Sequence, residues 1–428
     1  MNITTFSALK SRNYRLFITG QSISLIGTWM QKTAVSWVIY LLTHSEFMLG
    51  LSLFASMFPS FLFSFLGGVV SDRYDRYKVL LLTQVASMIQ AAILTVLIWS
   101  GFYNVWIILL LSAVLGVINA FDVPARQSLV NQMVDDQKLL PNALALNSSV
   151  VNLSRLIGPA IAGFILQQFG DTFCFALNSV SFIAVISTIL MMRLPRFEKP
   201  KEQKKVLQDL KDGLKYLRHT PSIRFLILML ALVSLLVLPF ATLIPVYAKD
   251  IFKGDASTFG IIDGVIGLGA FAGALFLASL KSAIKLRKIL SVNTLLFGVG
   301  LILFSHIPYY YLALFCAMIA GFGMMSQVTI TNTLIQTTVS PRMRGRVISF
   351  YAMAFFGMQP LGGLLVGALS QRIGVADTVL AEGIIALLIG LLHFRFIRKN
   401  RQRVIRYKEQ IRRRRTSQLP APEMTLPV

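Results

Sequence analysis

Two cations lie deep inside long apolar runs of this 428-residue chain. Lys32 lies about 18 residues into the first run and Arg155 about 12 residues into the fifth. Placing a charge in hydrocarbon is so unfavourable that such a residue is by default a functional candidate. Arg155 offers a planar, bidentate guanidinium for carboxylates, and Lys32 can bind charge or release a proton. The pair predicts a polar cavity for an anionic or zwitterionic substrate. Two neighbouring polar residues are expected to line it: Gln31 and Asn152.

The alternative is that these cations pair with buried acids and only hold helices together. Three acids within or beside the apolar runs are candidates for such pairing and for proton coupling: Asp263, Glu382 and Asp122. Asp263 and Glu382 each lie about two turns into a run, where a carboxyl could carry a proton, although both could also lie near the outer rim. Asp122 precedes Pro-Ala-Arg-Gln, so a structural pair with Arg126 or with the gate described next is favoured for it.

A short basic loop follows the second apolar run, in the pattern Gly-x-x-x-Asp-Arg-x-x-Arg-x-Lys. Its members are Gly68, Asp72, Arg73, Arg76 and Lys78. Gly68 would let one helix approach another closely, and Asp72 would accept hydrogen bonds from the positive end of a helix. Contacts of this kind form when a gate shuts and break when it opens, so the loop predicts a gate lock. The alternative is that its bases only mark the cytoplasmic side.

The fifth run contains a glycine–proline element in the sequence RLIGPAIAGFI, with Gly158, Pro159 and Gly163. Pro159 removes one backbone hydrogen bond and opens a bend, and the two glycines allow tight packing there. The element therefore predicts a kinked helix at a packing interface.

The elements that carry these residues are transmembrane helices. The chain is 55 % hydrophobic and only 14 % charged, whereas ordinary soluble domains are about a quarter charged. A spanning helix needs about 20 mostly apolar residues. The sequence predicts an all-α membrane protein with twelve such helices, at 14–42, 47–70, 79–100, 105–124, 143–167, 172–193, 223–247, 257–280, 286–306, 309–334, 345–371 and 376–397.

Nothing in the sequence indicates an enzyme, a cofactor or a metal site. Cys174 and Cys316 are far apart inside apolar runs, and the four histidines lack metal-ligand spacing. No nucleophile–base pair and no phosphate-binding loop is present among the motifs. The expectation is a chain without catalytic residues.

The positive charge of the chain predicts its orientation. Of 41 Lys and Arg residues, 36 lie in one alternate set of connections and three in the other. The positive-inside rule then places both termini in the cytoplasm. The net charge of +23 therefore reports topology and not nucleic-acid binding. The basic tail, Arg412 to Arg415 above all, is expected to lie against anionic lipid headgroups.

A polar connection at 194–222 divides the runs six and six, and its middle, 206–217, has the spacing of a short amphipathic helix. The expected organisation is an N-terminal six-helix bundle (1–193), a cytoplasmic linker (194–222), a C-terminal six-helix bundle (223–398) and a basic cytoplasmic tail (399–428). The halves also match each other at a shift of about 204 residues. Gln132 then aligns with Gln336, Gly158 with Gly362, and Gly163 with Gly367. Two parallel six-helix repeats are the plan of the major facilitator fold.

The loop from Gly68 to Lys78 resembles the signature of the major facilitator superfamily. Four stretches resemble the branch that holds the bacterial enterobactin exporter and macrolide and drug efflux proteins: SLIGTWMQKTAVSWVIYLLT, FDVPARQSLVNQMV, LPNALALNSSVVNLSRLIGPAIAGFI and RGRVISFYAMAFFGMQPLGGLLVGAL. The resemblance covers about residues 7–398. It implies alternating access and export driven by an inward proton gradient. The glycine–proline element resembles a shortened antiporter motif, and Asp75 stands where the signature usually has glycine.

The resulting prediction is a monomeric exporter of a small amphipathic molecule, a siderophore or a macrolide-like drug, by proton antiport. Its place would be the bacterial inner membrane, with a small-molecule substrate, protons and anionic lipids as its partners. The two buried cations favour an anionic cargo. The alternatives are a proton-coupled nutrient importer and a non-transporting membrane sensor on the same fold.

Overall fold

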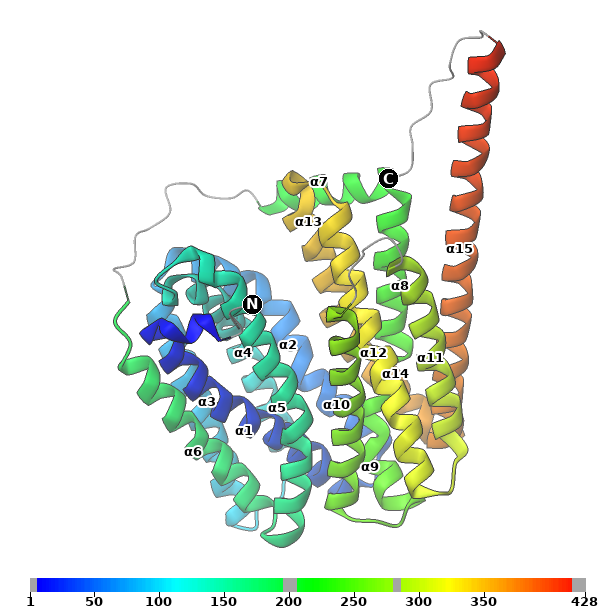
Figure 1. Cartoon of the computed structure of the whole chain (residues 1–428). Coiled ribbons are helices and arrows are strands. Elements are labelled where there is room, and N and C mark those ends of the chain that lie inside the picture. Colours follow the sequence, from blue (N-terminus) through cyan, green and yellow to red (C-terminus); the bar gives the residue numbers. More distant parts are fainter. Residues whose placement is uncertain (1–5, 195–205, 280–285, 418–428) are drawn as a thin grey trace.

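The computed structural model describes residues 6–194, 206–279 and 286–417, and it is helical throughout these ranges (Figure 1). The first half holds η1 (Ser7–Lys10), α1 (Arg12–Thr43), α2 (Glu46–Arg73), α3 (Arg76–Trp99), α4 (Val105–Met133), η2 (Gln137–Leu139), α5 (Leu140–Gln168) and α6 (Asp171–Leu190). The linker forms α7 (Val206–His219). The second half holds α8 (Pro221–Leu236), η3 (Leu238–Leu243), α9 (Ile244–Val246), η4 (Tyr247–Ile251), α10 (Ala256–Ala278), α11 (Leu286–His306), α12 (Tyr310–Thr338), α13 (Pro341–Ala352), η6 (Met353–Gly357), α14 (Met358–Ile373) and α15 (Val375–Ser417).

The predicted all-α membrane fold is confirmed. Within the described ranges, 11 helical segments are long and apolar enough to cross a membrane. The expected first span, α1, is not one of these. Its 32 residues reach about 48 Å at 1.5 Å per residue, so it has the length to span, but it carries Lys32 and a run of polar residues. It packs lengthwise against α5 and α6 inside the first half.

Two expected spans are interrupted. The run 223–247 is α8, η3, α9 and η4 in succession, because Pro239 and Pro245 lack the N–H that an α-helix needs. The run 345–371 is α13 and α14 joined by the π-helical turn η6. Several other helices extend past their apolar runs, since apolar composition marks the part in the membrane and not the end of the helix.

Glycine contacts support the predicted repeat. A Cβ on Gly163 of α5 would lie 2.6 Å from the backbone oxygen of Ala256, the first residue of α10. A Cβ on Gly367 of α14 would lie 2.6 Å from the backbone oxygen of Glu46, the first residue of α2. Two glycines that align in the sequence therefore make the same contact in the two halves.

The linker helix α7 packs on the second half. Asp212 forms an ion pair with Arg346 of α13 (3.2 Å), and Gly213 lies against the Phe350 ring. The structure thus has a helix where the sequence predicts one in the linker. The last helix, α15, continues as helix to Ser417, beyond the predicted span. The arginines expected to lie on anionic lipid, Arg412 to Arg415, are outside the residues whose side chains the structure describes.

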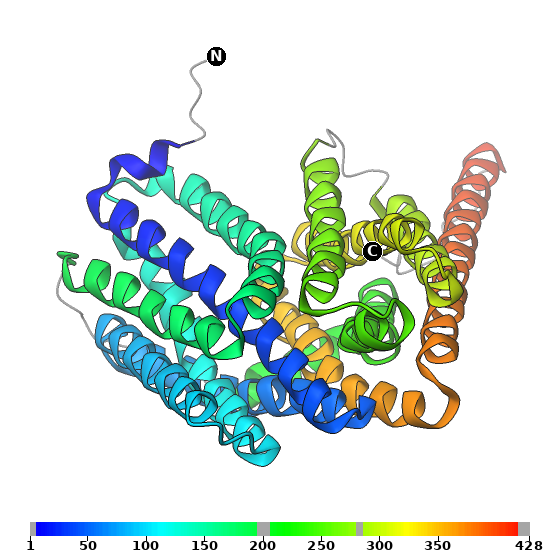
Figure 2. The same ribbon diagram turned by 90° about the horizontal axis from the view of Figure 1, so that it is seen from below.

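The two halves meet mainly through two helix pairs, α2 with α14 and α5 with α10. We call the face at which α1 begins the terminal face, and the other end the opposite face. The halves converge at the opposite face and diverge toward the terminal face (Figure 1). Figure 2, seen from below Figure 1, shows them as two groups of helices that lie side by side.

Candidate functional site

Two cations of the first half lie over one tryptophan, within electrostatic range of a carboxyl of the second half. The Lys32 ammonium lies 4.8 Å from the centroid of the Trp29 ring, and the Arg155 guanidinium carbon lies 5.7 Å from it. Asp263, on α10 of the second half, lies within electrostatic range of both cations. We call Trp29, Lys32, Arg155 and Asp263 the charged cluster. It brings together two predicted cavity residues and one predicted proton-coupling residue.

The charged cluster spans the two halves and is open to water. The Arg155 guanidinium donates to the Met324 sulfur of α12 across the interface (3.8 Å). The side chain of Lys32 is exposed, although Lys32 lies far inside α1 and close to Asp263 of the other half. Solvent therefore reaches the space between the halves at this depth.

The chemistry of the charged cluster suits an anion. Two cations and one carboxylate leave one excess positive charge. Both cations lie within the distance at which an aromatic face attracts a cation, so Trp29 helps to hold them in place. A carboxylate entering here could accept charge-assisted hydrogen bonds from Arg155 and Lys32.

One of the predicted cavity residues, Gln31, does not face this space. Gln31 is 3 % exposed and points into the first half, where it accepts from Asn178 (2.7 Å) and donates to Gln90 (3.1 Å). The prediction that Gln31 lines the cavity is wrong, because neighbouring residues on a helix point about 100° apart. Asn152 donates its amide to the Ser148 backbone oxygen of its own helix (2.9 Å).

Asp122 belongs to a network inside the first half. It pairs with Arg126 (2.7 Å), and it accepts from Thr83 (2.9 Å) and Gln84 (2.6 Å). The predicted pair with Arg126 is confirmed. Asp122 is 3 % exposed, and its oxygens are already engaged within the first half.

The polar contacts of the gate loop that the described residues show all lie within the first half. Asp72 lies 3.9 Å from Arg76, and its side chain is 56 % exposed. Arg76 also donates to the Ser71 backbone oxygen (3.1 Å). Asp75 caps α3 by accepting from the Tyr77 backbone N–H (3.0 Å), which gives the departure from glycine a structural role. Arg73 is the last residue of α2, and Lys78 lies in the first turn of α3.

The expected packing role of Gly68 is wrong in this state. A Cβ on Gly68 would meet nothing within 4 Å, whereas one on Gly67 would lie 1.8 Å from the Ala120 backbone oxygen of α4. The glycine that permits the close approach of α2 and α4 is therefore the preceding one, which points in a different direction around the helix.

The glycine–proline element lies at two interfaces. Gly158 packs against Trp29 of α1, where a Cβ would lie 2.5 Å from the Trp29 Cβ. Gly163 faces Gly260 of α10, and Pro159 presents its backbone oxygen to the same glycine. This part of α5 therefore holds both the charged cluster and the contact between the halves.

Contacts at the opposite face close the space between the halves, and the sequence did not reveal them. Tyr40 of α1 donates to Asp250 of η4, and Gln167 of α5 bonds to Asp255 and Ser257 at the start of α10. Gln371 donates to Ser45 (2.6 Å). We call these pairs the opposite-face gate. Such residues are ordinary rim residues in the sequence, and only the pairing of the halves distinguishes them.

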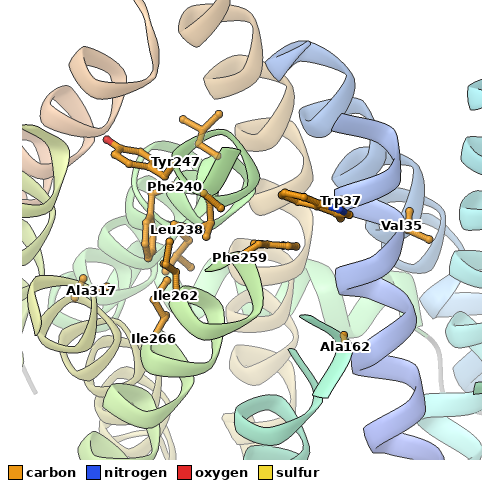
Figure 3. Close-up of a cluster of buried hydrophobic side chains, with 14 of the residues drawn as sticks. Val35, Trp37, Ala162, Leu238, Phe240, Tyr247, Phe259, Ile262, Ile266 and Ala317 are labelled. Carbon is orange, nitrogen blue, oxygen red and sulfur yellow. The ribbon is translucent and has the colours of Figure 1, made fainter. Parts of the chain in front are cut away.

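An aromatic pair lies next to the opposite-face gate, toward the interior of the protein. The rings of Trp37 and Phe259 stack across the halves with centroids 5.8 Å apart (Figure 3). The hydrogen bonds described between the halves all lie at this face or at Arg155. The described halves are therefore held together at the opposite face and diverge toward the terminal face (Figure 1).

Glu382 lies apart from the charged cluster, inside the second half, with 2 % exposure. Among the described residues, no group of three or more His, Cys, Asp or Glu side chains could hold a metal ion.

Comparison with known proteins identifies the family. Residues 3–426 match the family described as transmembrane secretion effector. The chain is 24 % identical to the staphyloferrin A transporter of Staphylococcus aureus, over 90 % of this chain and 96 % of that protein. It is 22 % identical to macrolide efflux protein A of Streptococcus pyogenes, over 90 % and 96 %. It is 26 % identical to the enterobactin exporter of Escherichia coli, over 89 % and 90 %.

A solved structure supports the fold. The bacterial homologue of the lysosomal transporter Spinster, in an inward-facing and unoccupied conformation, matches with a TM-score of 0.69 at 14 % identity. The match covers 90 % of this chain and 96 % of that one. The resemblance drawn from the loop and the four sequence stretches is thus confirmed. The chain belongs to the transmembrane secretion effector family of the major facilitator superfamily, a family of transporters and not of enzymes.

Proposed function

We propose that the chain exports a small, anionic, amphipathic molecule from the cytoplasm across the bacterial inner membrane in exchange for protons. The observation that carries this proposal is the charged cluster of Trp29, Lys32, Arg155 and Asp263. The terminal face is cytoplasmic in this proposal, which agrees with the positive-inside rule. The present state would then be open to the cytoplasm and ready to receive cargo.

The cluster supports the binding of an acidic cargo, because Lys32 and Arg155 could each hold a carboxylate. The exchange for protons rests on the resemblance to proton-driven exporters, with Asp263 as the candidate proton carrier beside the cargo. Relatives of the chain include a staphyloferrin A transporter, an enterobactin exporter and a macrolide efflux protein, and the first two suggest a siderophore cargo.

The test compares one fluorescent dye as its free carboxylate and as its methyl ester. Inside-out vesicles with an ATP-acidified interior should accumulate the carboxylate. Hydrogen bonds to charged groups contribute about 1.5–3 kcal/mol, and 1.4 kcal/mol is a factor of ten. Lys32→Gln and Arg155→Gln should therefore each lower carboxylate uptake about tenfold or more, while ester uptake changes little. Lys138→Gln removes an exposed cation outside the cluster and should match the wild type.

Other outcomes would contradict the proposal. Equal loss of both dyes in Lys32→Gln and Arg155→Gln would remove the charge argument. Accumulation only in right-side-out vesicles with external acid would indicate an importer. No transport of these dyes, of staphyloferrin A, of enterobactin or of a macrolide in any vesicle would favour a sensor.

A further inference from the structure

Glu382 is a carboxyl group enclosed within the second half. It lies seven residues into α15, which places it about 10 Å from the opposite face at 1.5 Å per residue. Its side chain is 2 % exposed. Among the described residues, neither of its carboxyl oxygens has a hydrogen-bond partner. Glu382 is therefore separate from the water-accessible charged cluster.

Among the described residues, the Glu382 carboxyl has no hydrogen-bonded cation. The charged and titratable groups on the helices that pack against α15 and on nearby η4 are Arg224 of α8, Arg287, Lys288 and His306 of α11, Arg372 of α14, and Tyr247, Lys249 and Asp250 of η4. On α15 itself, the titratable side chains that the structure describes are Asp377 and His393 and, beyond them and more than three turns from Glu382, Arg395, Arg398 and Lys399. His306 pairs with Asp377 (3.2 Å), and Arg287 lies near His393, about three turns away along α15. An unpaired carboxylate is far less favourable in an apolar interior than the neutral acid, so Glu382 carries a proton in this state.

The five-residue helix η4 connects Glu382 to the opposite-face gate. Tyr247, at its start, is fully buried and within electrostatic range of Glu382, and its hydroxyl donates to the Ser305 backbone oxygen (3.0 Å). Asp250, three residues later, accepts the hydrogen bond from Tyr40 of the first half. A short π-helix of this kind is frequent at functional sites. One small element thus lies within electrostatic range of the buried acid and contacts the gate.

We propose that Glu382 is a proton-binding site that controls the opposite-face gate through η4. The neutral carboxyl permits the packed second half, in which η4 holds Asp250 against Tyr40. Ionisation requires water around Glu382, and a shift of η4 that admits water also withdraws Asp250 from Tyr40. Closing the gate is thereby coupled to uptake of one proton by Glu382. The proposed function places the opposite face on the external side of the membrane. On that basis, the proton comes from the external solution.

The test measures the gate directly and does not depend on cargo. Spin labels are placed at two exposed loop residues of the opposite face, Phe102 in the first half and Tyr309 in the second. If the closed state binds the proton at least tenfold more tightly than the open state, the ratio of open to closed molecules should rise at least tenfold from low to high pH. Glu382→Gln, which is permanently neutral, should remain closed at every pH. Glu382→Asp should keep a pH response.

The matched control is Asp377→Asn, which removes an exposed carboxyl of the same helix, 61 % exposed, and should respond to pH as the wild type does. An infrared band of a buried neutral carboxyl should be present in the wild type and absent from Glu382→Gln. A wild-type pH response in Glu382→Gln, or an unchanged infrared band, would overturn this inference. A pH-dependent gate that needs Glu382 in a chain that exports no acidic dye would uphold this inference and refute the export proposal.

Discussion

Gly50→Ala should open the opposite face. Gly50 of α2 faces Gly363 of α14, and an added Cβ would lie 2.2 Å from the Gly363 backbone oxygen. Ordinary contact begins at 3.4 Å, so the two helices must separate by about 1.2 Å. The three nearest atoms are backbone atoms of Gly363 and Leu364, so a change of side-chain rotamer cannot relieve the strain.

The expected size of the effect follows from this overlap. Overpacking of a well-packed contact costs about 1–3 kcal/mol, which corresponds to a change of about 5–150-fold in the ratio of two states. Only the state closed at the opposite face contains this contact. Gly50→Ala should therefore move the population by that factor toward the state open at the opposite face.

Spin labels at Phe102 and Tyr309 provide the assay. The long-distance population should grow in Gly50→Ala, while a second label pair across the terminal face, at Tyr74 and Arg342, should shorten. Gly68→Ala, on the same helix, adds a methyl group to open space and should not open the opposite face. If Gly50→Ala keeps the wild-type distances, or if Gly68→Ala reproduces its effect, the contact between Gly50 and Gly363 is not what stabilises this state.

Two further predictions concern the first half. Asp122→Asn should leave Arg126, whose side chain is 18 % exposed, without its carboxylate and destabilise the protein by about 1–3 kcal/mol, measured as a lower thermal midpoint in detergent. Asp75→Ala should lose the α3 cap and about 0.5–2 kcal/mol, whereas Asp75→Asn, which can still cap, should lie near the wild type in the same assay. Equal midpoints for Asp75→Ala and Asp75→Asn would refute the capping role.

The sequence was sufficient to predict the helices, because apolar composition marks them. Apolar runs marked the helices, and the two aligned glycines, Gly163 and Gly367, indicated a repeat that their equal contacts support. The charged cluster was also partly predictable, because Lys32, Arg155 and Asp263 are unusual in apolar runs. Trp29 was missed because an aromatic residue in a membrane helix carries no such signal.

Errors arose where the direction of a side chain decides its role. Gln31 and Lys32 are adjacent, yet one points into the first half and the other into the space between the halves. Gly67 and Gly68 differ in the same way. The opposite-face gate needs the relative position of two halves that are distant in sequence, so residues such as Tyr40 and Asp250 could not be paired in advance.

The glycine seams have a consequence for the speed of opening. Where Gly163 meets Gly260, and Gly50 meets Gly363, backbone lies directly on backbone. Interlocked side chains would have to leave and re-enter rotamer wells when the helices slide, but the nearest atoms here are mostly backbone, with the Leu53 side chain lying on Gly363. The two halves can thus roll over each other with little repacking, and the activation barrier is left mainly to the polar pairs at the rim.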